Sequence, residues 1–281
     1  MLSKQKLKIA RNFSRAASTY DQVSVLQQEV GLRLLERLDL IKLQPTTILD
    51  LGSGTGSLSK ILSQKYPEAI VLNTDIATGM IHFAQMTHAS DNQRYLCGDG
   101  DDLPIKTHSI DFAFSNCALH WFLTPETVFK EIDRILKPKG LFLFSTFGPD
   151  TLKELRQCFK MLDQEGSVNL FIDMHHMGDM LLQEKFLDPV MDMEIITLTY
   201  KNAIELIRDL KLTGSHTVNT PKTKPQGLLT ASRLNQFLKC YEKDRNAEQR
   251  LPATFEVIYG HAWSGKSSTI HNQTIPCTVE F

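Results

Sequence analysis

The 281-residue sequence predicts an α/β fold in which helices cover both faces of a mostly parallel sheet. Two observations lead to this prediction. Between residues 47 and 147, apolar runs of strand length alternate with segments whose apolar residues recur at helical spacing. The first run ends in a cluster of small residues, TTILDLGSGTG, which is typical of a buried strand followed by a tight turn. Such alternation favours right-handed crossovers between parallel strands.

The remaining elements of this part follow from the same pattern. After the glycine-rich turn, SLSKILSQKY has the apolar spacing of a helix, and further helices are predicted over residues 78–89 and 125–136. Pro125 suits the first turn of the latter helix, and Lys137-Pro138 is expected to end it. Further strands are predicted in the runs AIVLNTD, RYLCGD, SIDFAFSN and GLFLFSTF.

Helices and two strands are predicted outside this alternating part. An N-terminal helix has Ile9, Phe13 and Ala17 on one face, and more helices are predicted over 23–40, 150–164, 202–212 and 230–247. Residues 165–185 are rich in Met, His and Phe, and 213–227 form a polar loop. The strand-like runs 192–200 and 253–263 are expected to form an antiparallel pair at the sheet edge.

We therefore expect a single domain over residues 1–281, built around a seven-stranded, mostly parallel sheet with an antiparallel edge strand. Its expected parts are lid helices at 1–40, a ligand-binding core at 47–147, cap elements with an edge strand at 150–250, and a final strand at 253–263.

Composition excludes several function classes. The formal net charge of −1 creates no overall field for nucleic acid or an anionic membrane, and no apolar run is long enough to predict a membrane span. The five cysteines include no CxxC pair, so neither a disulfide framework nor a zinc site is predicted, and a reducing, cytoplasmic compartment is expected. We interpret the basic, serine-rich first 20 residues as an amphipathic helix, with a transit peptide as the alternative.

The strongest functional signal is the turn Asp50-Leu51-Gly52-Ser53-Gly54-Thr55-Gly56. Its glycines permit positive φ angles and close approach of a ligand, and the following helix directs its N-terminal amides to the same place. The dinucleotide pattern is GxGxxG, whereas the spacing here is GxGxG and an acid precedes the first glycine. Asp50 at this turn suits the ammonium group of S-adenosylmethionine better than it suits a pyrophosphate.

Polar residues also end three further predicted strands. Asp75 ends the second and suits the two ribose hydroxyls of a nucleoside, and Asp99 after the third suits an adenine amino group. Asn116 ends the fourth. Because the carboxyl ends of parallel strands lie at one edge, these side chains are expected to surround one crevice.

The region 47–147 resembles the class I S-adenosylmethionine-dependent methyltransferases, which have a Rossmann-like fold. This resemblance implies S-adenosylmethionine as cofactor, with S-adenosylhomocysteine as product. It also implies a set of cofactor-binding residues, namely Asp50, Gly52, Gly54, Gly56, Asp75, Asp99 and Asn116.

Nearly the whole chain resembles one family of this class. The similar stretches are RNFSRAASTYD at 11–21 followed by Gln27, Asn116 to Trp121, FGPDTLKELR at 147–156, and His176 to Asp179. They are similar to the malonyl-acyl-carrier-protein O-methyltransferases of biotin synthesis. The resemblance implies methylation of the free carboxylate of a malonyl thioester, carried by acyl-carrier protein or coenzyme A. The resulting methyl ester primes pimeloyl synthesis.

The reaction needs no general base, because a malonyl carboxylate is ionised at neutral pH. Arg156 is the candidate anchor, since a guanidinium suits a planar carboxylate, although the thioester carbonyl or an outward orientation are alternatives. Tyr20 is expected to close over the cofactor, and His120 and Trp121 to line the substrate pocket, with simple packing as the alternative for Tyr20 and Trp121.

Other interpretations stay open at this point. The chain can be a methyltransferase of another small acid or a quinone precursor, or a repurposed assembly-factor homologue. His175-His176 lacks further residues at ligand spacing, so no metal is expected. The basic residues Lys4, Lys6, Lys8, Arg11 and Arg15 suit either an acidic carrier protein or solvent. No nucleic acid or membrane partner is expected.

Overall fold

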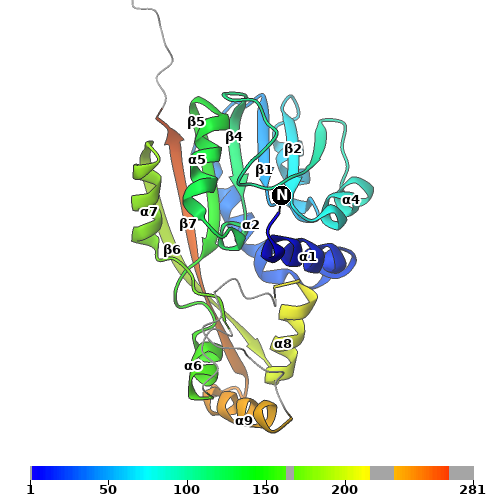
Figure 1. Cartoon of the computed structure of the whole chain (residues 1–281), viewed down its shortest axis with the longest axis vertical. Coiled ribbons are helices and arrows are strands. Elements are labelled where there is room, and N and C mark those ends of the chain that lie inside the picture. Colours follow the sequence, from blue (N-terminus) through cyan, green and yellow to red (C-terminus); the bar gives the residue numbers. More distant parts are fainter. Residues whose placement is uncertain (1, 163–167, 216–230, 266–281) are drawn as a thin grey trace, which may run out of the picture.

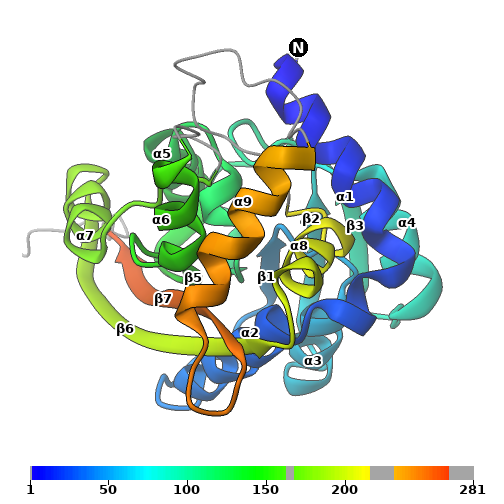
Figure 2. The ribbon, with the colours of Figure 1, turned by 90° about the horizontal axis from the view of Figure 1, so that it is seen from below.

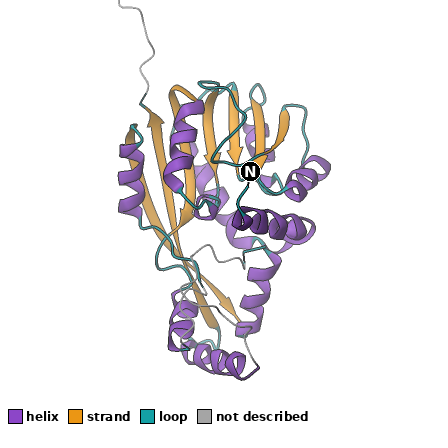
Figure 3. Ribbon diagram, in the orientation of Figure 1, coloured by secondary structure: helices purple, strands orange, loops and turns teal. Residues whose placement is uncertain are grey.

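The computed structural model describes residues 2–162, 168–215 and 231–265, and its centre is a seven-stranded sheet (Figures 1 and 3). The strand order is β3-β2-β1-β4-β5-β7-β6. β1 to β5 are parallel, whereas β7 is antiparallel to both of its neighbours. The strands are β1 (Thr47–Leu51), β2 (Ile70–Asp75), β3 (Gln93–Cys97), β4 (Ile110–Ser115), β5 (Leu136–Phe147), β6 (Phe186–Tyr200) and β7 (Leu251–Ser264).

Helices cover both faces of the sheet, and each face has its own apolar core. One core contains residues of α2 and α3, and the other contains residues of α5 and α7. α1 lies across the carboxyl ends of the parallel strands and contacts α4 (Figure 1). The helices are α1 (Lys4–Val23), α2 (Val25–Leu38), α3 (Ser57–Lys65), α4 (Thr78–Thr87), α5 (Pro125–Ile135), α6 (Lys153–Met161), α7 (Met174–Gln183), α8 (Ala203–Leu212) and α9 (Ala231–Tyr241).

The structure confirms the predicted antiparallel pair and refines its place. The reversed strand is β7, which lies second from the edge, and β6 is the edge strand.

β5 is longer than expected because it begins at Leu136, directly after α5. Leu136 pairs with Ile110 before a register shift, so Lys137-Pro138 lies inside an irregular strand start rather than in a loop. Most of the predicted polar loop 213–227 lies outside the described residues.

The far ends of β6 and β7 extend beyond β5 and support a helical cap (Figures 1 and 2). β5 pairs with β7 from Trp263 to Val257, whereas β6 follows β7 as far as Leu251. α6, α8 and α9 lie around this ribbon, and Cys158 of α6 forms a disulfide with Cys240 of α9. This link corrects the sequence analysis, which predicted no disulfide framework. The two cysteines are 82 residues apart in sequence, and only packing of the cap brings them together.

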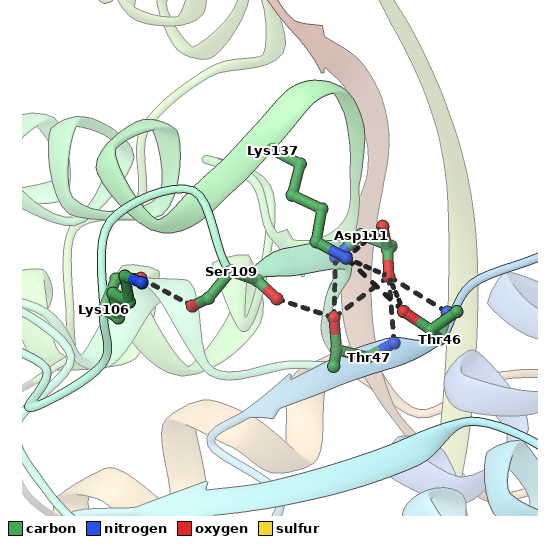
Figure 4. Close-up of polar contacts among 6 residues, drawn as sticks. All are labelled: Thr46, Thr47, Lys106, Ser109, Asp111 and Lys137. Atoms are coloured by element: carbon green, nitrogen blue, oxygen red, sulfur yellow. Dashed lines mark hydrogen bonds and ion pairs between the residues drawn. The ribbon is translucent and has the colours of Figure 1, made fainter.

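A polar cluster joins the amino ends of the central strands, at the edge of the sheet opposite the carboxyl ends (Figure 4). The Asp111 carboxylate accepts hydrogen bonds from the amides of Thr46 and Thr47, both at 3.0 Å, and from Lys137 Nζ at 2.9 Å. Burial would raise the pKa of Asp111, but the bonds from Lys137 and the two threonines outweigh burial and lower the pKa to about 2. Asp111 therefore stays ionised and stabilises the start of the sheet.

No described helix is both long enough and apolar enough to cross a membrane.

Candidate active site

A cavity of about 290 Å³ lies at the carboxyl ends of the parallel strands. One end is formed by the glycine-rich turn, Asp75, Asp99 and Asn116. α1 contributes Lys6, Phe13 and Tyr20 to the lining, and the cap contributes residues of α6 and α8. The structure therefore brings predicted cofactor residues from four strand ends together with the lid and the cap. A smaller cavity beside it is lined by Asp50, Gln27 and Tyr20.

The glycine-rich turn has the conformation that its composition predicts. Gly52, Gly54 and Gly56 all have positive φ, at 73°, 54° and 80°. The amides of Gly52 and Ser53 donate to the carbonyl of Thr74 at 2.7 and 3.0 Å, which joins the turn to the end of β2. A Cβ on Gly52 would lie 2.4 Å from Cβ of Ala118, closer than packed carbon atoms come. The turn is therefore shaped both by its φ angles and by the chain that passes beside it.

Asp75 and Asp50 end adjacent strands, and both carboxyl groups are held in place by donors. Asp75 accepts from the amides of Gly54 at 3.0 Å and Ala77 at 2.8 Å, and Asp50 accepts from the hydroxyl of buried Ser59. Burial raises the pKa of Asp75 to about 6 and, with a smaller contribution from the charge of Asp75, raises the pKa of Asp50 to about 7. Hydrogen-bond donors or a cation on a bound ligand would therefore favour the ionised form of both carboxyl groups.

Asp99 lies at the cavity, but its carboxylate has a partner that the sequence did not predict. Lys6 Nζ of α1 lies 2.8 and 2.6 Å from its two oxygens and also pairs with Asp101. These contacts attach the lid helix to the loop after β3. Asn116 connects two other elements, because it accepts from Ser145 Oγ at 2.7 Å and donates to the carbonyl of Gln27 at 2.9 Å.

Tyr20 lies near the end of the lid helix and lines both cavities. The next residue, Asp21, accepts from the hydroxyl of Thr55 in the glycine-rich turn and lies 3.1 Å from Nε2 of His88. Asp21 therefore fastens the end of α1 to the cofactor turn and to the end of α4. The stretch RNFSRAASTYD predicts a lid, but the role of Asp21 depends on contacts with residues 34 and 67 positions away in the sequence.

Aromatic side chains form the wall between the cofactor end and the cap. The ring of His120 lies 5.1 Å from Trp121, 4.9 Å from Phe147 and 5.7 Å from Phe171, and Trp121 meets Phe13 of the lid edge to face at 5.1 Å. Burial lowers the pKa of His120 to about 3, so the imidazole is neutral at physiological pH. His120 and Trp121 both line the cavity, and neither supplies a positive charge there.

Two residues of the cavity lining have backbone conformations that residues other than glycine rarely adopt. Cys117 has φ 50° and Leu152 has φ 54°, and this region costs a residue with a side chain about 1–2 kcal/mol. The amide of Cys117 donates to Ser145 Oγ at 2.9 Å, and that of Leu152 donates to the carbonyl of Thr254 at 2.6 Å. These bonds hold both strained segments in place at the cavity.

The structure does not bring Arg156 into this cavity. The guanidinium of Arg156 donates to the carbonyls of Pro149 at 2.6 Å and Thr151 at 2.8 Å, and Arg156 is absent from the described lining. α6 begins just after the turn that exposes these two carbonyls, so one helical turn later Arg156 reaches back to them. The expected carboxylate anchor instead braces the loop between β5 and α6.

Lys211 lines the cavity and was missed by the sequence analysis. Among the described lining residues, the lysines and arginines are Lys6 and Lys211, and Lys6 is already paired with two aspartates. Lys211 lies in the last turn of α8, is exposed, and is in no ion pair that the described residues form. Its position near the lid follows from packing, since a Cβ on Gly214 would lie 3.4 Å from Cα of Phe13.

The raised pKa values of Asp75 and Asp50 lead to a pH prediction. We expect the affinity for S-adenosylmethionine to fall as pH is lowered through about 7 and about 6, because protonation removes the charges that the ligand's donors and cation require. The ligand-free protein should show the opposite trend in stability. A carboxyl group whose folded-state pKa is raised contributes to stability in full only below its unfolded pKa of about 4, and this contribution is lost as pH rises through about 6 for Asp75 and about 7 for Asp50. Calorimetric titration measures the affinity, and thermal unfolding measures the stability, across about pH 5 to 8. If affinity and stability changed in the same direction with pH, the proposed role of the two aspartates would be contradicted.

Comparisons with known proteins agree with this geometry. Residues 49–144 match the methyltransferase domain family. A malonyl-(acyl-carrier protein) O-methyltransferase of Gallionella capsiferriformans is 47% identical, over 89% of this chain and 88% of that protein. The enzyme of the same name from Nitrosospira multiformis is 46% identical, over 92% of this chain and 89% of that protein.

Solved structures support the fold. The YcgJ protein of Bacillus subtilis superimposes with a TM-score of 0.59 at 16% identity, covering 83% of this chain and 98% of that one. A phosphoethanolamine N-methyltransferase of Haemonchus contortus, bound to S-adenosylhomocysteine, has a TM-score of 0.54 at 15% identity, covering 84% of this chain and 52% of that one. The predicted class I methyltransferase fold is confirmed, and the chain belongs to the family of malonyl-(acyl-carrier protein) O-methyltransferases.

Proposed function

We propose that this protein transfers a methyl group from S-adenosylmethionine to the free carboxylate of a malonyl thioester carried by acyl-carrier protein. The observation that supports this most directly is the shape of the cavity. It joins the strand-end acids to a cap whose lining is mostly apolar and includes Lys211. A short acyl chain with one negative charge fits such a lining.

The cofactor would be held by residues whose chemistry matches its parts. Asp75 would accept from the ribose hydroxyls, the glycine-rich turn would receive the amino-acid end, and Asp50 and Tyr20 would flank the ammonium group. Asp99 remains available for a further hydrogen bond from the adenine amino group, since a carboxylate has about four acceptor sites. The bound cofactor supplies an electrophilic methyl group on a positively charged sulfur.

The described side chains favour catalysis by positioning. In the proposed reaction a carboxylate oxygen would form the new bond to the methyl carbon as the sulfur–methyl bond breaks, and the electron pair of the broken bond would stay on sulfur. No proton moves, because the carboxylate is already ionised. The neutral His120 and the thiol of Cys117, whose pKa burial raises to about 12, would exclude water and align the acyl chain rather than act as bases.

Lys211 is the residue that we propose for recognising the malonyl charge. A lysine ammonium attracts a carboxylate without the bidentate grip of a guanidinium, so the nucleophile stays less tightly held. The methyl-ester product is neutral, so its attraction to Lys211 would be lost after transfer. This difference would favour release of the product.

Methyl transfer to malonyl-acyl-carrier protein, followed by the mass of the acyl group, tests the function. We expect a gain of one methyl group and formation of S-adenosylhomocysteine. Lys211→Met should raise KM for the malonyl thioester roughly 10- to 100-fold with little change in kcat, since a hydrogen bond to a charged group contributes about 1.5–3 kcal/mol. Arg208→Met, one turn earlier on α8 and absent from the described lining, is the matched control.

Two results would contradict these proposals separately. Saturable binding of S-adenosylmethionine without transfer to the malonyl thioester would refute the substrate assignment. Transfer by the unmodified protein, with the same KM in Lys211→Met and Arg208→Met, would refute only the role of Lys211. Lys211→Arg should restore much of the affinity, because it restores the charge.

A further inference from the structure

The lid helix α1 has two faces of different chemistry. Lys6, Ile9, Phe13 and Tyr20 of its inner face line the cavity. The opposite face presents four exposed basic side chains at intervals of four, three and four residues, which aligns them along one side of the helix: Lys4, Lys8, Arg11 and Arg15. The same helix therefore covers the cavity and displays a continuous basic stripe, defined here as these four residues.

The charges of the basic stripe are not neutralised by other described residues. α1 has no acid in its first turn, and its first acidic residue is Asp21, which is bound to Thr55 and His88. None of the four stripe residues takes part in the ion pairs of the described chain, whereas Lys6 on the other face pairs with Asp99 and Asp101.

This row of like charges destabilises α1 when nothing is bound to the stripe. Like charges three or four residues apart on a helix repel, and the stripe contains three such pairs. Lys4 in the first turn is also unfavourable beside the positive end of the helix dipole. An acidic surface bound against the stripe would remove both penalties.

The stripe lies close to the substrate end of the cavity. The C-terminal end of α8, which contains Lys211, packs beside α1 at Phe13, and both views of the ribbon show the two helices as neighbours (Figures 1 and 2). A helix is about 10–12 Å across, so a partner on its outer face is about that far from the cavity. A thioester on a flexible arm can cover this distance.

We infer that the basic stripe of α1 is the docking surface for an acidic face of the acyl-carrier protein. This inference rests on the proposed function. An anionic membrane is the less favoured occupant, because a membrane-bound amphipathic helix inserts its apolar face, and the apolar face of α1 already covers the cavity. The stripe thus selects the carrier, and the cavity selects the acyl group.

The test compares two substrates with the same reacting group. The variant combines Lys4→Gln, Lys8→Gln, Arg11→Gln and Arg15→Gln, which keep good helix formers. We expect kcat/KM for malonyl-acyl-carrier protein to fall roughly tenfold or more, and kcat/KM for malonyl-pantetheine, which has no carrier, to stay within about twofold. Added salt should lower kcat/KM for malonyl-acyl-carrier protein more in the unmodified protein than in the variant.

A matched control separates position from net charge. Lys8→Gln with Arg11→Gln removes two charges from the stripe, and Lys42→Gln with Lys130→Gln removes two exposed charges elsewhere. Equal effects of the two pairs on the carrier reaction, or equal losses with both substrates, would overturn the inference. Binding of the unmodified protein to vesicles of anionic lipid, with no change in carrier kinetics, would overturn it in favour of a membrane.

A direct binding measurement tests the docking surface independently of the proposed reaction. Titration of the acyl-carrier protein with the unmodified protein and the four-residue variant measures docking without chemistry. Loss of binding in the variant supports the surface even where transfer to malonyl thioesters fails. Absence of carrier binding by the unmodified protein, together with transfer to malonyl-pantetheine, would refute the surface and leave the reaction intact.

Discussion

Replacement of Asp75 by alanine is expected to raise the Kd for S-adenosylmethionine about 100-fold or more. The carboxylate ends β2 at the cavity and would accept from two ribose hydroxyls. Each hydrogen bond to a charged acceptor contributes about 1.5–3 kcal/mol, and a loss near 3 kcal/mol corresponds to roughly two orders of magnitude in Kd. Calorimetric titration measures the change directly, and methyl transfer at low cofactor concentration should fall in parallel.

Controls distinguish a binding role from a purely structural one. Asp75 also accepts from the amides of Gly54 and Ala77, so its removal is expected to loosen the turn. Asp75→Glu keeps the charge and should restore much of the affinity, while Asp91→Asn removes an exposed carboxyl group outside the cavity and should leave the Kd unchanged. An affinity of Asp75→Ala within threefold of the unmodified protein would rule out the proposed ribose contact.

Gly52→Ala is expected to have the second large effect, on both folding and binding. The added Cβ would lie 2.4 Å from Cβ of Ala118, and the residue would have to keep φ at 73°. Left-handed backbone costs about 1–2 kcal/mol for a residue with a side chain, and overpacking about 1–3 kcal/mol more. We expect urea unfolding to show a loss of about 3 kcal/mol, and the Kd for S-adenosylmethionine to rise at least about tenfold.

Gly54→Ala provides a matched control for the contribution of steric overlap. Gly54 also has positive φ, at 54°, but a Cβ there would meet no atom within 4 Å. Gly54→Ala should reduce the free energy of unfolding only by the cost of left-handed backbone, about 1–2 kcal/mol. Equal losses in the two variants would show that backbone conformation, and not the contact with Ala118, shapes this turn.

Local pattern predicted the sheet and the cofactor end of the site. The run TTILDLGSGTG predicted β1 and its turn because apolar strands and glycines at positive φ have signatures within a few residues. Asp75, Asp99 and Asn116 were then expected at one edge, since parallel strands align their carboxyl ends. The structure places all three at the same cavity.

The substrate end depended on contacts that no local pattern contains. The residue type of Arg156 predicts a carboxylate anchor, yet its guanidinium binds the carbonyls of Pro149 and Thr151, and the cavity lining includes Lys211 instead of Arg156. Likewise, Lys6 pairs with Asp99 across 93 residues, and Cys158 is linked to Cys240 across 82. Secondary-structure periodicity and turn chemistry act within a few residues, so the sequence was sufficient for most of the elements and for the cofactor turn, but not for α7 or for the first residues of β5 and β6. The packing of distant elements decides which basic side chain lines the cavity, how the lid is attached and how the cap is closed. This packing depends on the whole folded chain.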